Sequence, residues 1–231
     1  MKKIVFVFLI FIILISSSCS FFDNDTSGNY YDVENFNGDL HFPEEIGIGD
    51  FRNDWYSRKL IELEEPVIPA QKEKYISIYR LTCLRTWHNP FSIRIEINEQ
   101  DESAILFFKM CDGMGGFDIG NLIIDEQIIL DRSEIESFIE SIEKYDYWKM
   151  PFNENDIGGR DGSNWIIEML KNGKYHAISR WSPNHTEQYQ YNEHDDDWEL
   201  YELDRISDLG AVYELGLFFI ELSKQEIEAL Y

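Results

Sequence analysis

Apolar and polar residues alternate regularly at a period of two over residues 91–97. Such alternation predicts a strand with one buried face and one solvated face. Runs rich in β-forming residues also occupy residues 75–82, 104–111 and 122–130. We expect these four strands to pair in an antiparallel sheet.

A β-hairpin is the strongest local prediction. Residues 164–170 and 174–181 flank the dipeptide Asn172-Gly173, which favours a two-residue type I′ turn. The turn sets the register of the two strands and therefore the composition of their two faces. One face should carry Trp165, Ile167, Met169, His176, Ile178 and Arg180. The other should carry Ile166, Glu168, Leu170, Tyr175, Ala177 and Ser179.

Two helices complete the predicted fold. The first begins at Asp131 or Ser133, carries an apolar stripe and ends near Tyr147, since Pro151 cannot continue it. Residues 209–222 are apolar on nearly every side, which predicts a buried helix. The pattern as a whole predicts an α+β fold. Its antiparallel sheet should have about five or six strands, with one amphipathic helix and one buried C-terminal helix packed on it.

The N-terminus has the pattern of a bacterial lipoprotein signal peptide. Two lysines precede an apolar run over residues 4–15, and small serines then lead to Cys19. The run is too short to span a bilayer, which takes about 20 apolar residues. We expect cleavage just before Cys19 and lipid modification of its thiol, which would anchor the protein to a membrane. Ser16 stands where such signals usually carry leucine, so simple secretion stays open as an alternative.

Composition divides the chain into a signal peptide (1–18), an arm (19–69) and one α+β domain (70–231). The arm is polar, yet its latter half holds several large aromatic residues. We therefore expect that half to dock on the domain and the earlier part to act as a tether. Acidic residues dominate residues 184–204, which we expect to form a long solvated loop.

A strong negative charge limits the partners. The chain has 20 lysines and arginines against 44 aspartates and glutamates, a formal net charge of −24. Such a chain repels nucleic-acid phosphates, so we expect no nucleic-acid partner. Apolar residues make up 44% of the chain, which predicts a folded core rather than disorder. The sequence contains no CxxC, HExxH or phosphate-loop motif, and we expect no cofactor.

Cys83 and Cys111 are the remaining thiols once Cys19 is acylated. Each lies near the end of a predicted strand, and disulfides persist in the compartments to which exported proteins go. The pattern leaves two alternatives open, a disulfide between them or two half-buried small apolar side chains on neighbouring strands.

Four stretches occur together in the chain: residues 84–90 (LRTWHNP), residues 161–168 beginning with DGSNW, residues 172–183 ending with RWSP, and residues 214–222 beginning with ELGL. In this combination the chain resembles an uncharacterised family of bacterial putative lipoproteins. The resemblance implies export and a single fold, and it implies no activity, cofactor or catalytic residue. The acidic segment that follows the third stretch departs from the family pattern.

The predicted tether contains one metal-binding pattern. Asp23, Asp25, Ser27 and Glu34 stand at the positions of oxygen ligands in a twelve-residue calcium loop. No helix pattern flanks this loop, and a flexible acidic spacer is the competing interpretation.

Basic residues gather around one predicted turn. Residues 70–94 hold five lysines and arginines against a single glutamate. An exposed tryptophan beside arginine and asparagine can stack on a sugar ring or bind a carboxylate. The alternative is that these bases pair with carboxylates of the protein itself. The candidate ligand-binding residues are Arg85, Trp87, His88, Asn89, Arg160, Asp161, His176 and Arg180.

Taken together, these patterns predict a lipid-anchored protein of the bacterial cell envelope. We expect a non-enzymatic binding module for a protein or a glycan. An envelope hydrolase is one alternative, in which His176 would act with a carboxylate such as Asp161 or Glu168. An immunity-like inhibitor of a basic partner is another, and it follows from the acidity alone.

Overall fold

The computed structural model describes residues 38–71, 73–152, 161–184, 187–192, 197–202 and 208–230. All of them belong to one unit of the chain, Asn35–Tyr231. The predictions for the signal peptide, Cys19, Arg160 and the calcium pattern at Asp23, Asp25, Ser27 and Glu34 lie outside the described residues. Among the described residues, no helix is long and apolar enough to cross a membrane.

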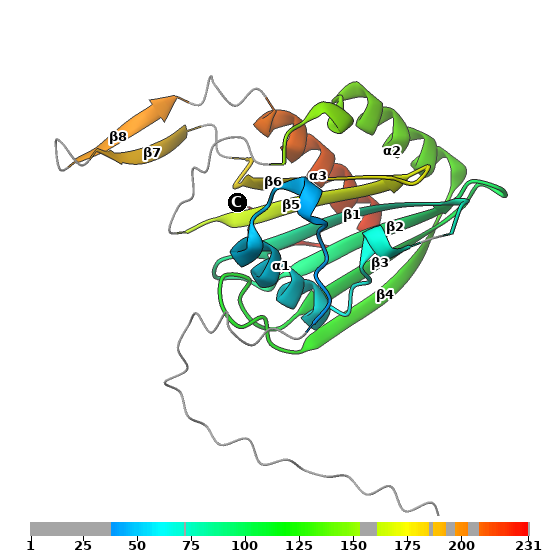
Figure 1. Ribbon diagram of the computed structural model, residues 1–231, viewed down its shortest axis with the longest axis horizontal. Coiled ribbons are helices and arrows are strands. Elements are labelled where there is room, and N and C mark those ends of the chain that lie inside the picture. Colours follow the sequence, from blue (N-terminus) through cyan, green and yellow to red (C-terminus); the bar gives the residue numbers. More distant parts are fainter. Residues whose placement is uncertain are drawn as a thin grey trace, which may run out of the picture. The chain divides into compact units, whose positions relative to one another are not determined.

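Within the described residues, six strands form one antiparallel sheet, and with the helices they make the predicted α+β fold (Figure 1). The order across the sheet is β4-β3-β2-β1-β5-β6. The strands are β1 (Ile76–Arg85), β2 (Phe91–Asn98), β3 (Ser103–Cys111), β4 (Leu122–Leu130), β5 (Ser163–Lys171) and β6 (Lys174–Trp181). Strands β4 and β6 are therefore the two edges.

The β5–β6 hairpin forms in the predicted register. Trp165 lies opposite Arg180, and Met169 lies opposite His176. Asn172 and Gly173 have φ angles of 52° and 73°, and a type I′ turn needs positive φ at both of these positions. The two predicted faces of the hairpin are therefore confirmed.

One face of the sheet, which we call the helix face, is covered by α2 (Arg132–Lys144) and α3 (Leu209–Ser223). The helix α2 starts with a capping box, in which Glu134 N–H donates to the Asp131 side chain at 2.9 Å. In return, Asp131 N–H donates to the Glu134 side chain at 2.8 Å. This exchange satisfies N–H groups that the first helical turn leaves without a partner.

The helix α3 approaches the sheet closely at one point. A Cβ atom on Gly216 would lie 2.2 Å from the ring of Trp165, so only glycine permits this contact. The buried core between the helices and the sheet includes Leu81, Ile93, Ile95, Leu106, Phe108, Phe138, Ile167, Val212, Leu215 and Phe219.

The opposite face, which we call the arm face, is covered by the segment that the sequence assigns to the arm (Figure 1). This segment contains η2 (Glu44–Ile46), α1 (Asp50–Glu62) and η3 (Ile68–Ala70). Tyr56 and Leu60 of α1 pack with Leu84 and Ile166 of the sheet. The latter half of the arm thus lies against the domain, and it includes a helix that the sequence pattern does not predict.

The acidic segment differs from the expected loop. Strands β7 (Glu187–Asn192) and β8 (Asp197–Glu202) pair antiparallel as a separate two-stranded sheet. Tyr191 lies opposite Trp198 in this register, and Tyr189 lies opposite Leu200. Aromatic and β-forming residue types at paired positions favour strands. The predicted loop is therefore wrong for residues 187–192 and 197–202, because the alternation of aromatic or aliphatic with polar residues there favours strands despite the acidic composition.

Both cysteines of the domain are buried and free. Cys83 belongs to the core of the helix face. Cys111 packs with Leu63 and Ile119 on the arm face. Since they lie on opposite faces of the sheet, the structure has two buried thiols rather than a disulfide.

Candidate functional site

Trp87 is the most exposed aromatic residue among the predicted site residues, and its side chain is held in place. It lies in the turn between β1 and β2 and is 53% exposed. Its indole N–H donates to a carboxylate oxygen of Asp161. The ring centroids of Trp87 and Phe117 are 5.0 Å apart. We call the surface formed by Trp87, Phe117 and Asp161 the Trp87 platform.

Backbone contacts between three loops fix the turn below this platform. Thr86 N–H donates to the carbonyl of Gly162 at 2.8 Å. Gly115 N–H donates to the carbonyl of His88 at 3.2 Å. A Cβ on Gly115 would lie 2.5 Å from the backbone nitrogen of Arg85, so the glycine allows the loop before β4 to close on the turn. The platform is therefore assembled before any partner arrives.

A hydrogen bond between the Arg85 side chain and the Asn89 backbone stabilises the turn. Arg85 is 2% exposed, and its Nε–H donates to the carbonyl of Asn89 at 3.0 Å. The guanidinium also donates to the carbonyls of Glu228 and Ala229 in the C-terminal tail. Its donors are thus directed at the backbone of the protein, and Arg85 has a structural role.

His176 and Glu168 lie on opposite faces of the sheet. The ring nitrogen Nε2 of His176 lies 2.7 Å from the carbonyl oxygen of Met150. Tyr147 and Trp148 pack beside the imidazole at centroid distances of 5.3 and 6.2 Å. Burial lowers the pKa of His176, which favours the neutral ring. The structure does not bring His176 together with Glu168, and Asp161 is engaged by Trp87 on the platform.

Arg180 is a structural residue as well. Its side chain is buried and donates from Nε to Asp208 at 2.9 Å. It also donates to the carbonyls of Phe152 and Pro151 at 2.8 and 3.1 Å. Arg180 therefore joins β6 to the segment after α2 and to the start of α3.

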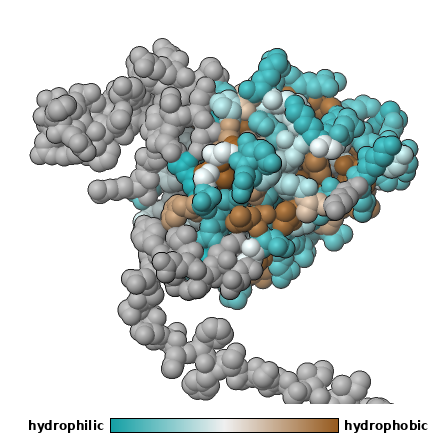
Figure 2. Space-filling view, in the orientation of Figure 1, coloured by the Kyte–Doolittle hydropathy of each residue, from teal (hydrophilic) through white to brown (hydrophobic). Residues whose placement is uncertain are grey.

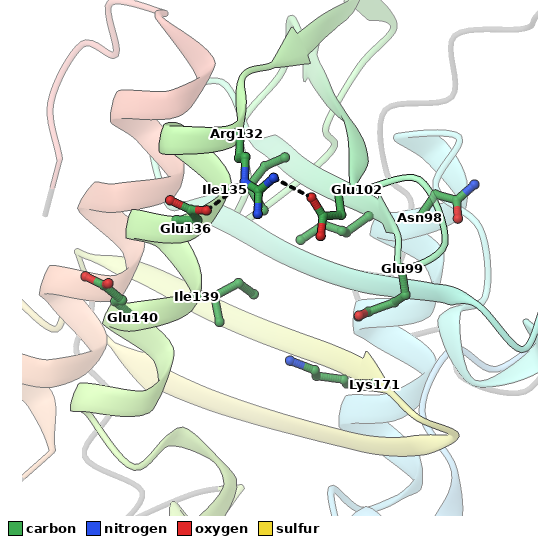
Figure 3. A pocket seen from close by; sticks show the side chains of 10 residues that line it. Asn98, Glu99, Glu102, Arg132, Ile135, Glu136, Ile139, Glu140 and Lys171 are labelled. Atoms are coloured by element: carbon green, nitrogen blue, oxygen red, sulfur yellow. Dashed lines mark hydrogen bonds and ion pairs between the residues drawn. The ribbon is translucent and has the colours of Figure 1, made fainter.

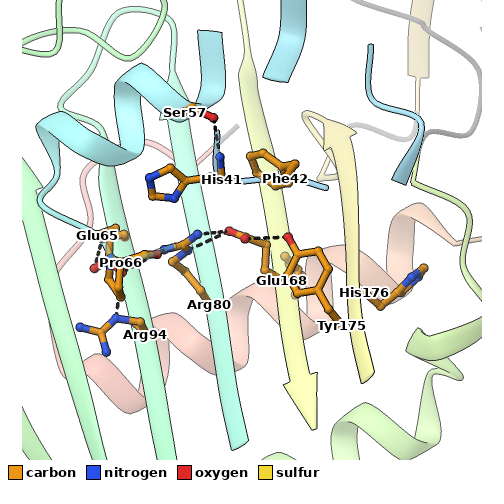
Figure 4. Close-up of polar contacts among 12 residues, drawn as sticks. His41, Phe42, Ser57, Glu65, Pro66, Arg80, Arg94, Glu168, Tyr175 and His176 are labelled. Atoms are coloured by element: carbon orange, nitrogen blue, oxygen red, sulfur yellow. Dashed lines mark hydrogen bonds and ion pairs between the residues drawn. The ribbon is translucent and has the colours of Figure 1, made fainter. Parts of the chain in front are cut away.

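A buried ion network occupies the middle of the arm face (Figure 4). Arg80 Nε–H donates to Glu168 at 2.8 Å, and Arg80 also pairs with Glu65 at 3.2 Å. Arg94 donates to the same Glu65 carboxylate at 2.8 Å, and the Tyr175 hydroxyl donates to Glu168 at 2.9 Å. The side chains of Glu65, Arg80 and Glu168 have no exposed surface.

Burial raises the pKa of Glu168, while the neighbouring Arg80 opposes that shift. The predicted alternative that basic residues pair internally thus describes Arg80 and Arg94. The sequence contained a partial signal for this network, because Arg80 and Glu168 interrupt β-forming runs. Arg94 is a regular polar position of the alternation over residues 91–97, and the expectation that this polar face is solvated is wrong, because the face is largely buried.

His41 is a further buried polar residue of the arm face that the sequence analysis did not single out. It is 1% exposed, and its backbone N–H donates to the Ser57 hydroxyl at 2.8 Å. Its Nδ1 atom has no hydrogen-bond partner among the described residues. Burial, with a smaller contribution from Arg80, lowers the pKa of His41 to about 3.

A pocket of about 380 Å³ lies beside α2 (Figure 3). Ile97, Ile135 and Ile139 provide its apolar lining. At the rim, Arg132 pairs with Glu102 at 2.9 Å and with Glu136 at 2.8 Å. These exposed ion pairs neutralise the charge of Arg132 within the protein. Because none of the polar residues that line the pocket is buried, the pocket has no fixed polar group that would select a ligand.

In the part of the chain that the structure describes, no group of three or more histidine, cysteine, aspartate or glutamate residues is arranged to hold a metal ion. Comparison with known proteins found that no family model matches the chain and that no curated protein matches it.

Proposed function

We propose that the protein is a lipid-anchored binding module of the bacterial cell envelope and that it is not an enzyme. The observation that carries this proposal is the exposure of Trp87 on a side chain held by Asp161 and Phe117. A large aromatic ring that is already held in one orientation loses little conformational entropy on binding. The Trp87 platform is the proposed contact surface.

The platform suits a partner with apolar C–H groups next to hydrogen-bond donors. The indole face supplies apolar contact area, and the carboxylate of Asp161 can accept further hydrogen bonds beside it. Envelope glycans and protein loops both present such groups. The net charge of −24 argues against a nucleic-acid partner.

The anchor rests on the N-terminal pattern and on the resemblance to bacterial putative lipoproteins. Lipidation of Cys19 would place the domain at a membrane of the envelope. The hydrolase alternative has less support, because His176 contacts a backbone carbonyl and lies across the sheet from Glu168. Mass spectrometry of the mature N-terminus tests the anchor. An unmodified Cys19 would remove the anchor and leave the binding proposal intact.

The binding proposal is tested with Trp87→Ala. The probe is isolated peptidoglycan and, in parallel, an envelope protein fraction, with binding measured by co-sedimentation or surface plasmon resonance. We expect Trp87→Ala to weaken binding by about tenfold or more, as for a central aromatic contact residue. Its free energy of unfolding should fall by about 1–3 kcal/mol, through loss of the hydrogen bond to Asp161 and the contact with Phe117, and the protein should remain folded.

Tyr75→Ala is the matched control, because Tyr75 is a 48% exposed aromatic residue outside the platform. It should bind like the unaltered protein. Arg85→Ala provides the opposite contrast, since it removes buried backbone contacts and should lower stability. Equal losses of binding in Trp87→Ala and Tyr75→Ala, or no loss in either, would contradict the proposed site.

A further inference from the structure

The edge strand β4 carries exposed isoleucines on the arm face of the sheet. Ile129 is 83% exposed and Ile123 is 53% exposed. Ile105 of β3 is 39% exposed and lies directly opposite Ile129. In Figure 2, apolar residues gather on the same side of the molecule as α1. We call the outer side of β4, with Ile105, Ile123, Asp125, Glu126 and Ile129, the β4 edge.

The other edge of the sheet is already occupied in part. Ser179 of β6 donates its backbone N–H to the carbonyl of Phe152 at 2.8 Å. On β4, no strand among the described residues pairs with the outer side. A long edge strand with aliphatic side chains is a template for pairing with another chain.

Glu126, at the centre of β4, contacts a neutral side chain, whereas Asp125 interacts electrostatically with Arg94 on the arm face. Glu126 accepts a hydrogen bond from the neutral amide of Gln225 at 2.8 Å. Lys109 lies opposite Asp125, but its ammonium group donates to the carbonyl of Glu64 at 2.8 Å. The centre of the edge therefore carries Asp125 on the arm face and Glu126 on the helix face, between two aliphatic ends.

This distribution of charge selects the kind of partner. The strand reads Leu-Ile-Ile-Asp-Glu-Gln-Ile-Ile-Leu, an apolar–polar–apolar pattern that is the same in both directions. Antiparallel pairing of two copies about the strand centre would place Glu126 against its own counterpart. Like charges opposite one another are destabilising, and each copy carries a net charge of −24. A strand with basic residues at its centre has the complementary charge.

We propose that the β4 edge binds an extended segment of a partner protein, with aliphatic residues at its ends and lysine or arginine at its centre. The segment adds to the sheet as a further strand. Main-chain hydrogen bonds supply affinity, and the aliphatic and charged side chains select the sequence. This surface is separate from the Trp87 platform, so the inference stands or falls independently of the proposed function.

The probe is a capped nine-residue peptide, Val-Thr-Val-Lys-Lys-Lys-Val-Thr-Val, titrated into the lipid-free protein and followed by fluorescence anisotropy. Ile129→Lys places a charge on the edge at a highly exposed position, where the fold should tolerate it. We expect it to weaken peptide binding by about tenfold. The double change Asp125→Asn with Glu126→Gln should weaken binding several-fold and reduce its dependence on salt.

Ile61→Lys is the matched control, because Ile61 is a 42% exposed isoleucine on α1. It and Trp87→Ala should bind the peptide like the unaltered protein. Amide hydrogen exchange of the saturated complex should show new protection in β4. The proposal is overturned by absence of binding at millimolar peptide, by equal binding of a peptide with glutamate in place of lysine, or by protection elsewhere. A dimer that Ile129→Lys dissociates would assign the edge to a second copy and would also overturn it.

Discussion

The two faces of the central sheet are stabilised in different ways. On the helix face, α2 and α3 cover one continuous apolar core that extends from Leu106 to Trp165. On the arm face, the apolar clusters are smaller and surround the ion network of Glu65, Arg80 and Glu168. Burial of apolar side chains stabilises any well-packed arrangement. A buried ion network stabilises the fold only when each charged group lies next to its partner.

The two faces therefore contribute to the fold in different ways. The helix face supplies the bulk of the hydrophobic stabilisation. The arm face determines which segment covers the sheet and where, because Glu65 follows α1 and contacts both Arg80 of β1 and Arg94 of β2. The segment between the predicted tether and the domain is thereby held at the centre of the sheet.

Removing Arg80 should produce the largest effect. Arg80→Ala leaves Glu65 and Glu168 buried without their cation, and we expect the free energy of unfolding to fall by about 3–5 kcal/mol. Urea denaturation monitored by tryptophan fluorescence measures this change. Arg132→Ala is the control, because that arginine also pairs with two glutamates but is 72% exposed. A loss of less than about 1 kcal/mol is expected there. Equal losses of stability in Arg80→Ala and Arg132→Ala would mean that the buried network stabilises the arm face no more than an exposed ion pair does.

Sequence periodicity predicted the helix face better than the arm face. The strands, the Asn172-Gly173 turn and the capping box at Asp131 are local patterns, and each one forms. Local patterns are informative because the partners lie within a few residues of one another. The helix α1 was missed because its thirteen residues mix polar and apolar types without a clear apolar stripe.

In the candidate site, too, the sequence predicted some features and missed those that depend on residues far apart in the chain. Trp87 and Asp161 were selected from the sequence, and the structure places them in direct contact. The ion network depends on pairs such as Arg80 and Glu168, which are 88 residues apart, and no local spacing identifies such partners. The sequence also indicates Arg85 and Arg180 as ligand-binding candidates, because an arginine that donates to backbone carbonyls cannot be told apart in sequence from one that binds a ligand.

The arm face should also be the more sensitive to acid. The pKa of His41 is about 3 in the folded protein, below its ordinary value of 6.5. Between these values the unfolded state binds more protons, so stability is lost as the pH falls below about 6.5. At pH 5 this amounts to about 2 kcal/mol relative to the neutral side chain. His41→Gln should remove that part of the loss between pH 7 and pH 5, as measured by denaturation at both values.

His176→Gln is the comparison for the other side of the sheet. Burial lowers the pKa of His176 too, but the side chain is only half-buried and contacts a carbonyl oxygen. Its replacement should therefore change the pH dependence less than His41→Gln does. A larger effect at His176 would reverse the proposed order of the two faces.

The smallest effect should come from a change of shape on the helix face. Leu215→Met keeps the volume of a fully buried apolar side chain, and flexible methionine can fill the same space. We expect a loss of less than about 1.5 kcal/mol in urea denaturation. The corresponding conservative change on the arm face, Arg80→Lys, keeps the charge but cannot reproduce the planar donors that reach Glu168 and Glu65 together. It should therefore cost more than Leu215→Met. If the two substitutions lowered the free energy of unfolding equally, packing alone would account for the stability of both faces. The ion network would then not be needed to position the arm on the sheet.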